Sequence, residues 1–337
     1  MVWNRRSIGF TVLGVVAAGA LAVGGIMLAS GSSPSHPAAA PTHVATPTPS
    51  PAQTGPLRSP FTGKRVSALR RVLAVKIGNT VPERPPTGLT KADLVYVIPV
   101  EGGLSRLLAV FSTHFPPVIG PVRSSRADDL MLLRQFGRPG FAFSGAQPFL
   151  LPVVEHAHIV NLYDGSVGGY FRGTSRSAPY NLYAHTRTLL AESRHASMAR
   201  DIGFRFGAAP PGGRVMHAKS VSYPAASFRF TWSAAKRRWL VWMDGSRARA
   251  TEGGQLGAPT VVIQYTRVRT SGYLEADRRP PYAVTDGAGR ALVMRDGRAY
   301  RVHWSRRHAN GGTSFTLPSG QPMRFARGPV WIVLAYR

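Results

Sequence analysis

The sequence predicts an α/β or α+β N-terminal domain followed by a mainly β C-terminal domain, with a transmembrane helix ahead of both. The helix is predicted by an apolar run without any charged side chain, Ile8–Ala29. Strand-like and helix-like segments are mixed in residues 58–207, whereas strand-like segments dominate residues 220–337. A chain of 337 residues is long enough for two such domains and an N-terminal tail.

Residues 8–30 have the length and the flanks of a membrane anchor. As a helix, the apolar run would span ~33 Å, about the thickness of the hydrocarbon core of a bilayer. Arg5 and Arg6 precede the run, and no charged residue follows it until Arg58. The positive-inside rule therefore places residues 1–7 in the cytoplasm and the folded domains outside, with the cytoplasmic membrane as the first expected partner.

A cleaved signal peptide is the alternative interpretation of the same run. Ala29-Ser30-Gly31 would then be the cleavage site, although the run is longer than the usual apolar core of a signal peptide. In that case the folded part would be secreted rather than anchored.

Residues 31–57 are predicted to be a disordered linker. They consist almost entirely of Pro, Ser, Thr, Ala, Gly and His, and they contain no aromatic residue. Such a segment cannot bury enough apolar surface to offset the entropy that ordering costs.

Residues 58–207 contain short apolar runs bounded by turn residues, together with segments of helical spacing. The expected strands are Arg71–Ile77, Ala92–Val100, Leu107–Ser112 and Gly140–Ser144. The expected helices are Asp128–Phe136, Pro148–Glu155 and Thr186–Ile202.

Gly207–Gly213 is the expected domain boundary, because helical spacing fades beyond this Gly/Pro-rich segment. The dipeptide Asp296-Gly297 lies between two apolar runs and predicts a two-residue hairpin. The expected strands of the second domain are Ser227–Trp232, Arg238–Met243, Thr260–Val268, Ala291–Met294, Ala299–Trp304 and Val330–Tyr336.

The chain is strongly basic and lacks cysteine. Lysine plus arginine number 42 against 15 acidic residues, a formal net charge of +27. This charge would attract polyanions such as nucleic acid, anionic lipid or acidic wall polymer, but arginine enrichment in a GC-rich genome explains it equally well. The absence of cysteine excludes disulfides, thiolate metal sites and a lipid-modified cysteine.

Three segments combine arginine with Gly, Ser or Pro, a composition that is unusual for residues with a purely structural role. They are Val100–Arg106, Ile119–Asp129 and Tyr170–His185. We expect them to form a candidate anionic-ligand pocket. Its candidate residues are Glu101, Arg106, Arg123, Ser124, Arg126, Asp128, Arg172, Arg176 and Asn181.

The second segment has the best chemistry for an anion. Ser124 or Ser125 could cap the helix that follows, while Arg123 and Arg126 supply forked donors. An internal salt-bridge network, with these arginines paired to Glu101 or Asp128, explains the same residues. Catalysis is a third interpretation, but no complete catalytic set, metal site or cofactor motif accompanies the segments.

The segments that stand out also resemble a known family. In order, LAVKIGN, ERPPTGLTKADLVY, VEGGLSRLLAVF, IGPVRSSR and SRSAPYNLYA lie between Ser59 and Ala184. They resemble the YerB-like family of envelope lipoproteins, which carries an N-terminal and a C-terminal domain of unknown function, number 3048. A looser match follows in APTVVIQYTRV, RDGRAYRVHW and GPVWIVL.

The resemblance implies an extracytoplasmic location, a two-domain layout and no assigned reaction. This chain departs from the family's pattern in two ways. Many relatives attach through a lipidated cysteine, which is absent here, so the apolar helix would have to be the anchor. Where relatives are expected to carry a histidine, this chain has Phe143 and Ser144, which argues against a shared histidine mechanism.

Three functions follow from these observations. The first is a membrane-anchored extracytoplasmic protein that binds an anionic envelope ligand, namely a wall polymer, glycan or lipid head group. The second is an enzyme that acts on a polyprenyl-phosphate-linked substrate. This hypothesis is based on a weak resemblance of the N-terminal sequence pattern to LytR-CpsA-Psr transferases. In such an enzyme, Arg123, Arg126 and Asp128 would hold a pyrophosphate and its metal ion. The third is non-specific binding of nucleic acid, which the predicted orientation argues against in the cell.

Overall fold

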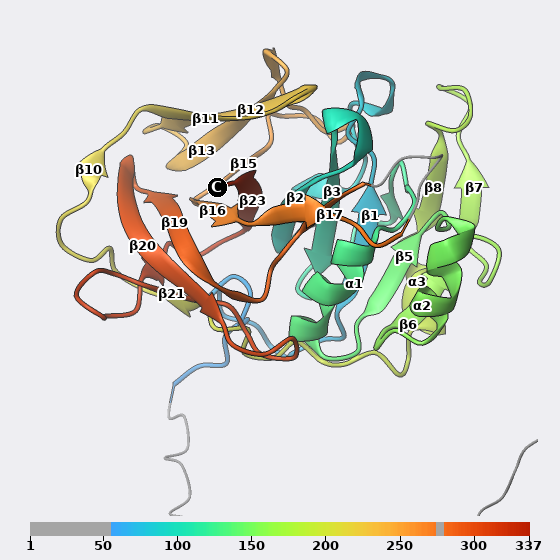
Figure 1. Cartoon of the computed structure of the whole chain (residues 1–337), viewed down its shortest axis with the longest axis horizontal. Coiled ribbons are helices and arrows are strands. Elements are labelled where there is room, and N and C mark those ends of the chain that lie inside the picture. The colour runs from blue at the N-terminus through green and yellow to red at the C-terminus, as the bar shows by residue number, and fades with distance from the viewer. Residues whose placement is uncertain (1–54, 274–279) are drawn as a thin grey trace, which may run out of the picture. The chain divides into compact units, whose positions relative to one another are not determined.

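The structure is a computed structural model that describes residues 55–273 and 280–337 (Figure 1). The predicted anchor, residues 8–30, and nearly all of the predicted linker, residues 31–57, lie outside the described residues. Among the helices that are described, none has the length and apolar character needed to cross a bilayer. The single membrane pass therefore stays a prediction from the sequence.

One large mixed sheet runs through the described residues and draws strands from both predicted domains. Its strand order is β10-β20-β19-β16-β23-β2-β3-β1-β5-β6, and β21 pairs with β20. The strands are β1 (Leu73–Ile77), β2 (Leu94–Pro99), β3 (Ser105–Phe111), β5 (Gly140–Phe143), β6 (Val160–Tyr163), β10 (Arg214–Val215), β16 (Thr260–Thr266), β19 (Gly287–Arg295), β20 (Arg298–Arg306), β21 (Ser314–Thr316) and β23 (Val330–Tyr336).

The two halves of the chain join at β23, which pairs in parallel with β2 on one side and β16 on the other. Leu94 and Thr260 both lie opposite Val330. Strand β23 is an apolar run without alternation, as expected for a strand with both faces covered. The predicted domains are therefore two stretches of sequence that contribute to one sheet and form one compact unit.

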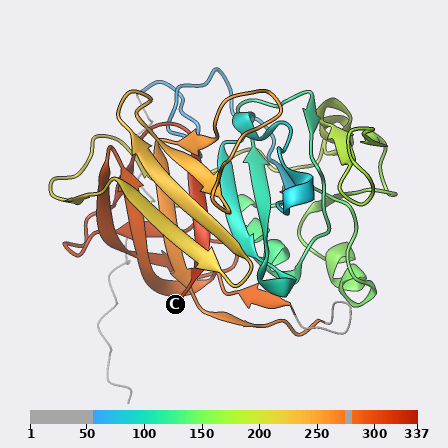
Figure 2. The ribbon, with the colours of Figure 1, turned by 90° about the horizontal axis from the view of Figure 1, so that it is seen from above.

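A second, smaller sheet lies on one face of the large sheet, above β16 and β23 (Figures 1 and 2). Side chains of the two sheets share one hydrophobic cluster; Phe230, for example, meets Trp331 edge to face, with 6.3 Å between ring centroids. The strands of the second sheet are β11 (Ala218–Tyr223), β12 (Ala226–Ser233), β13 (Arg238–Met243), β14 (Ser246–Arg247) and β15 (Gly257–Ala258).

Helix α1 (Ala127–Leu133) covers the opposite face and continues as one 3-10 turn, Arg134–Phe136. Its buried leucines and Phe136 join a second cluster with side chains from the large sheet. Helices α2 (Leu151–Glu155) and α3 (Thr186–Glu192) lie beside β5 and β6 (Figure 1). The remaining strands form small sheets: β4 (Val118–Ile119), β7 (Tyr170–Arg172) and β8 (Leu182–His185); β9 (Arg205–Phe206) and β22 (Arg324–Phe325); β17 (Val268–Thr270) and β18 (Pro281–Ala283).

The strand-rich character with few helices agrees with the sequence, and the two-residue turn at Asp296-Gly297 is confirmed by the pairing of Arg295 with Arg298. The predicted helix Thr186–Ile202 is wrong beyond Glu192. The chain is instead extended around Met198, where it forms backbone hydrogen bonds with residues 70–72, just before β1. These backbone hydrogen bonds, formed with a segment distant in the sequence, outweigh the helical propensity of residues 193–202.

Candidate anion-binding sites

The three predicted segments meet at one edge of the large sheet. Strands β1, β2, β5 and β6 run in the same direction, so their carboxyl ends share this edge. In α/β sheets this is where ligands commonly bind. The first segment follows β2 directly. The second passes between the ends of β1 and β5, because Arg123 N donates to Lys76 O and Ser144 N donates to Arg123 O. The third pairs with the second through Ile119 and Ala184.

Glu101 neutralises two of the predicted arginines. Arg126 donates to both carboxylate oxygens of Glu101, through Nε at 2.9 Å and through Nη2. Arg106 donates to Glu101 Oε1 at 3.2 Å and to the carbonyl of Ser124 at 2.9 Å. Burial alone would raise the pKa of Glu101, but the hydrogen bonds and charges of Arg126 and Arg106 outweigh it and lower the pKa to about 2. This carboxylate therefore stays ionised at neutral pH.

Glu83, which we did not predict as a site residue, neutralises Arg123. Arg123 Nε lies 2.9 Å from Glu83 Oε1, and the Glu83 side chain is only 1% exposed. Glu83 also accepts hydrogen bonds from the backbone and hydroxyl of Thr80. The sequence held a signal for the latter role, since Thr80-Val-Pro-Glu83 matches a capping box.

The arginines of the third segment, Arg172 and Arg176, form hydrogen bonds that hold nearby loop backbone in place. Arg176 donates to the carbonyls of Glu83 and Pro85 at 3.1 and 2.7 Å. Arg172 donates to Asn181 Oδ1 at 3.0 Å, and Asn181 in turn donates to the carbonyl of Gly173. These bonds fix the β7–β8 hairpin.

A buried ion pair lies beneath these loops. Lys76 Nζ and Asp129 Oδ1 are 2.5 Å apart, and both side chains are fully buried. Asp129 Oδ2 also accepts the backbone N–H of Arg126, which is the N-cap residue of α1. The expectation that Ser124 or Ser125 caps this helix is therefore wrong, because Asp129 already satisfies the helix start.

Asp128, the neighbour of this pair, is buried without a countercharge in direct contact. Its Oδ2 accepts the backbone N–H of Ala283 at 3.3 Å, and its Oδ1 has no hydrogen-bond partner among the described residues. Burial, followed by the negative charge of Asp129, raises the pKa of Asp128 to about 7. This side chain therefore titrates close to neutral pH.

The geometry matches the salt-bridge interpretation of the motif arginines, with Glu101 and Glu83 as the acidic partners rather than Asp128. An anion at this edge would have to compete with these internal partners. Anion binding between the three segments stays a prediction.

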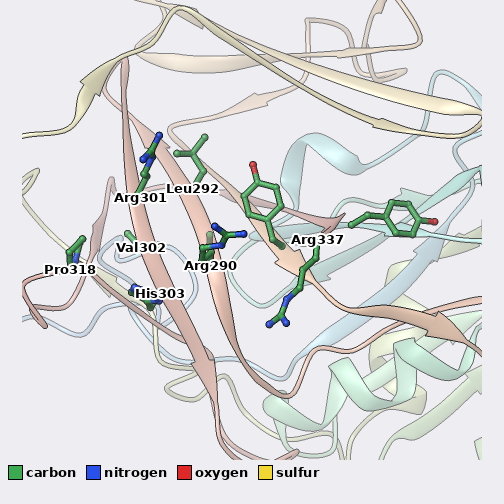
Figure 3. A pocket seen from close by; sticks show the side chains of 10 residues that line it. Arg290, Leu292, Arg301, Val302, His303, Pro318 and Arg337 are labelled. Carbon is green, nitrogen blue, oxygen red and sulfur yellow. The ribbon is translucent and has the colours of Figure 1, made fainter.

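A different concave surface carries arginines without such partners. On the face of the large sheet beyond the second sheet, a cavity of about 630 Å³ lies over β19 and β20 (Figure 3). We call it the arginine groove. Its basic residues are Arg290, Arg301, His303 and Arg337.

The register of the β19–β20 hairpin places Arg290, Arg301 and His303 on one face. Arg301 lies opposite Leu292, and His303 lies opposite Arg290, so all four side chains point to the same side of the sheet. Figure 3 shows Arg290, Leu292 and Arg301 rising from the two neighbouring strands. Leu292, Tyr265 and Tyr336 give the groove an apolar component.

The groove arginines are open to solvent. Arg290 and Arg301 are exposed, and the side chain of neither forms an ion pair or hydrogen bond with another described residue. Arg337 donates only to the carbonyl of Ala288, at 2.8 Å, among described residues. No Asp or Glu of residues 55–273 and 280–337 lines the cavity. Sequence reasoning missed this site, although the alternation Arg301-Val-His303 within a predicted strand was a visible signal of a basic face.

The shifted pKa of Asp128 predicts a pH-dependent stability. Because the folded state holds the proton more tightly than the unfolded chain, the free energy of unfolding should fall as pH rises from about 4 through about 7. Between pH 5 and pH 8, Asp128→Asn should therefore gain roughly 2 kcal/mol relative to the wild type. Urea unfolding followed by tryptophan fluorescence measures this difference.

The matched control is Glu192→Gln, which replaces an exposed carboxylate that forms no ion pair with described residues. It should retain the pH dependence of the wild type. Equal pH slopes for Asp128→Asn and the wild type would contradict the assignment.

The fold and sequence match proteins of one family. The sequence model of the family described as "Protein of unknown function (DUF3048) N-terminal domain" matches residues 61–199, and the model of the corresponding C-terminal domain matches residues 219–332. The crystal structure of the YerB protein from Bacillus subtilis has a similar fold, with a TM-score of 0.70 and 21% identity over 83% of this chain and 96% of that chain.

A curated relative agrees with this match. "Putative lipoprotein YerB" of Bacillus subtilis (strain 168) is 33% identical over 132 residues, which are 38% of this chain and 40% of the relative. The aligned part thus spans less than half of that protein. The resemblance predicted from the motifs is confirmed: the chain belongs to the DUF3048 family of proteins of unknown function and carries its N-terminal and C-terminal domains in order.

Proposed function

We propose that the chain is a membrane-anchored extracytoplasmic protein that binds an anionic component of the cell envelope in the arginine groove, without catalysing a reaction. The observation that carries the proposal is the contrast between two sets of arginines. Those of the motifs are engaged by Glu101, Glu83 and backbone carbonyls, whereas Arg290 and Arg301 line a cavity to which the described part of the chain contributes no acidic residue.

The chemistry of the groove suits an anion on a partly apolar carrier. Guanidinium groups form forked hydrogen bonds with phosphate and carboxylate oxygens. The tyrosine and leucine side chains between them can contact sugar or polyol carbons. Unpaired cations at a concave surface also concentrate anions by long-range attraction, which salt weakens.

The envelope location rests on two observations. The relative from Bacillus subtilis is described as a lipoprotein, a class of membrane-associated proteins. In this chain, the apolar run Ile8–Ala29 with its preceding arginines provides the membrane attachment that a lipidated cysteine would otherwise supply.

The alternative of an enzyme for polyprenyl-phosphate-linked substrates receives less support. It would use Arg123, Arg126 and Asp128 to hold a pyrophosphate and its metal ion. Arg126 is held by Glu101, and Asp128 is only 2% exposed. An enzyme of this kind would have to release Arg126 from Glu101 and expose Asp128, whereas binding in the arginine groove requires neither change.

Wall retention tests the binding proposal. The full-length protein, solubilised in a neutral detergent, is incubated with purified cell wall at low salt, and the retained fraction is titrated. Replacing both exposed groove arginines, Arg290→Ala with Arg301→Ala, should weaken retention at least tenfold, because each loses a charge-assisted contact.

The control removes the same charge elsewhere: Arg187 and Arg194 are also exposed and form no ion pair with described residues. Arg187→Ala with Arg194→Ala should change retention less than twofold. Equal losses in the two double variants would mean that only net charge matters, and unchanged retention in the groove variant would refute the groove as the site.

Protease treatment of protoplasts tests the predicted topology. With one tag before Met1 and another after Arg337, external protease should remove the C-terminal tag while the N-terminal tag stays on a small membrane-bound fragment. A cytoplasmic protein must survive as the control. An intact C-terminal tag would contradict the orientation, and an N-terminal tag separated from the rest before protease treatment would indicate a cleaved signal peptide.

A further inference from the structure

The arginine groove does not end at its own cavity. A neighbouring cavity of about 490 Å³ shares Arg301 and Pro318 with it and adds Arg214. On the other side, a cavity of about 360 Å³ shares Tyr336 and adds Arg269. Shared lining residues make the three cavities neighbours along one surface.

This extended surface is basic throughout. Each cavity contributes at least one exposed arginine, and among the described residues no Asp or Glu lines any of the three. The side chain of Arg214 forms no hydrogen bond or ion pair with another described residue, whereas the guanidinium of Arg269 lies 4.9 Å from the ring centroid of Tyr282 and also hydrogen-bonds to that side chain. Both flanking arginines can therefore add to binding only when the ligand reaches beyond the central cavity.

The spacing of the cations favours a repeated anion. Arg301 is opposite Leu292, so Arg290 is its diagonal neighbour on the adjacent strand, with Cβ atoms about 7 Å apart. The apolar side chains of Leu292 and Tyr265 line the same cavity. A ligand that fits this pattern carries anions separated by a few uncharged carbon atoms.

We propose that the three joined cavities bind a linear phosphodiester-linked polyol chain, whose successive phosphates contact Arg214, Arg301, Arg290 and Arg269 in turn. This inference rests on the proposed function and specifies the class of its ligand. A single lipid head group would occupy one cavity only, and guanidinium forks suit phosphate geometry. Several weak contacts along one chain add to a binding free energy that a single unit cannot reach.

The test compares ligand lengths. Binding of the full-length protein in neutral detergent to glycerol phosphate, and to glycerol-phosphate oligomers of two to twelve units, is measured by calorimetry at low salt. The longest oligomers should bind at least tenfold more tightly than the single unit. Arg290→Ala with Arg301→Ala should weaken binding of every length, whereas Arg214→Ala with Arg269→Ala should weaken only the long oligomers.

The outcomes separate this inference from the proposed function. If the single unit binds as tightly as the longest oligomer, or if the flanking variant binds long oligomers normally, the extended site is refuted while wall retention through the central arginines can still hold. If no oligomer binds although the wall retains the protein, the ligand class is wrong. If single-stranded DNA of equal charge competes as well as the long oligomer, the surface binds polyanions without selecting a polyol chain, and the inference also fails.

Discussion

The parallel pairing of β23 with β2 and β16 is the constraint on which the rest of the structure depends. It joins strands from the two family domains into one sheet, so each face of the sheet can be covered by a single layer. Val330 to Ala335 are all at most 3% exposed. Burial of each large apolar side chain contributes about 1.5–3 kcal/mol. The same strand places Tyr336 and Arg337 at the groove.

The excess of arginine serves two different purposes in the fold. Inside, Arg126 and Lys76 are matched by Glu101 and Asp129, and such buried pairs fix geometry more than they add stability, since desolvation offsets their attraction. Removing either Lys76 or Asp129 would leave the other charge buried without a partner and lower the free energy of unfolding by about 3–5 kcal/mol. Outside, the side chains of Arg290 and Arg301 form no hydrogen bond with described residues, and the proposed ligand would contact them there. Net charge alone therefore gives a poor indication of where binding occurs.

Local patterns in the sequence predicted most strands of the large sheet and the Asp296-Gly297 turn, because alternation and turn chemistry depend on neighbouring residues; most of the short strands outside it were missed. They could not predict that β23 returns to pair with β2, which is more than 200 residues away in the chain. The partner of Arg123 was missed for the same reason: Glu83 approaches it only after the loops fold together. The groove was missed because it exists where the second sheet stops covering the first, which is a tertiary property.

Binding in the arginine groove is tested most directly by hydrogen–deuterium exchange of the full-length protein with and without purified wall polymer. A ligand in the groove should slow exchange in β19, β20 and the C-terminal end of β23, with little change in residues 119–126 and 170–185. Protection of those two motif loops, with none in the β19–β20 hairpin, would contradict it and return the binding site to the motif arginines.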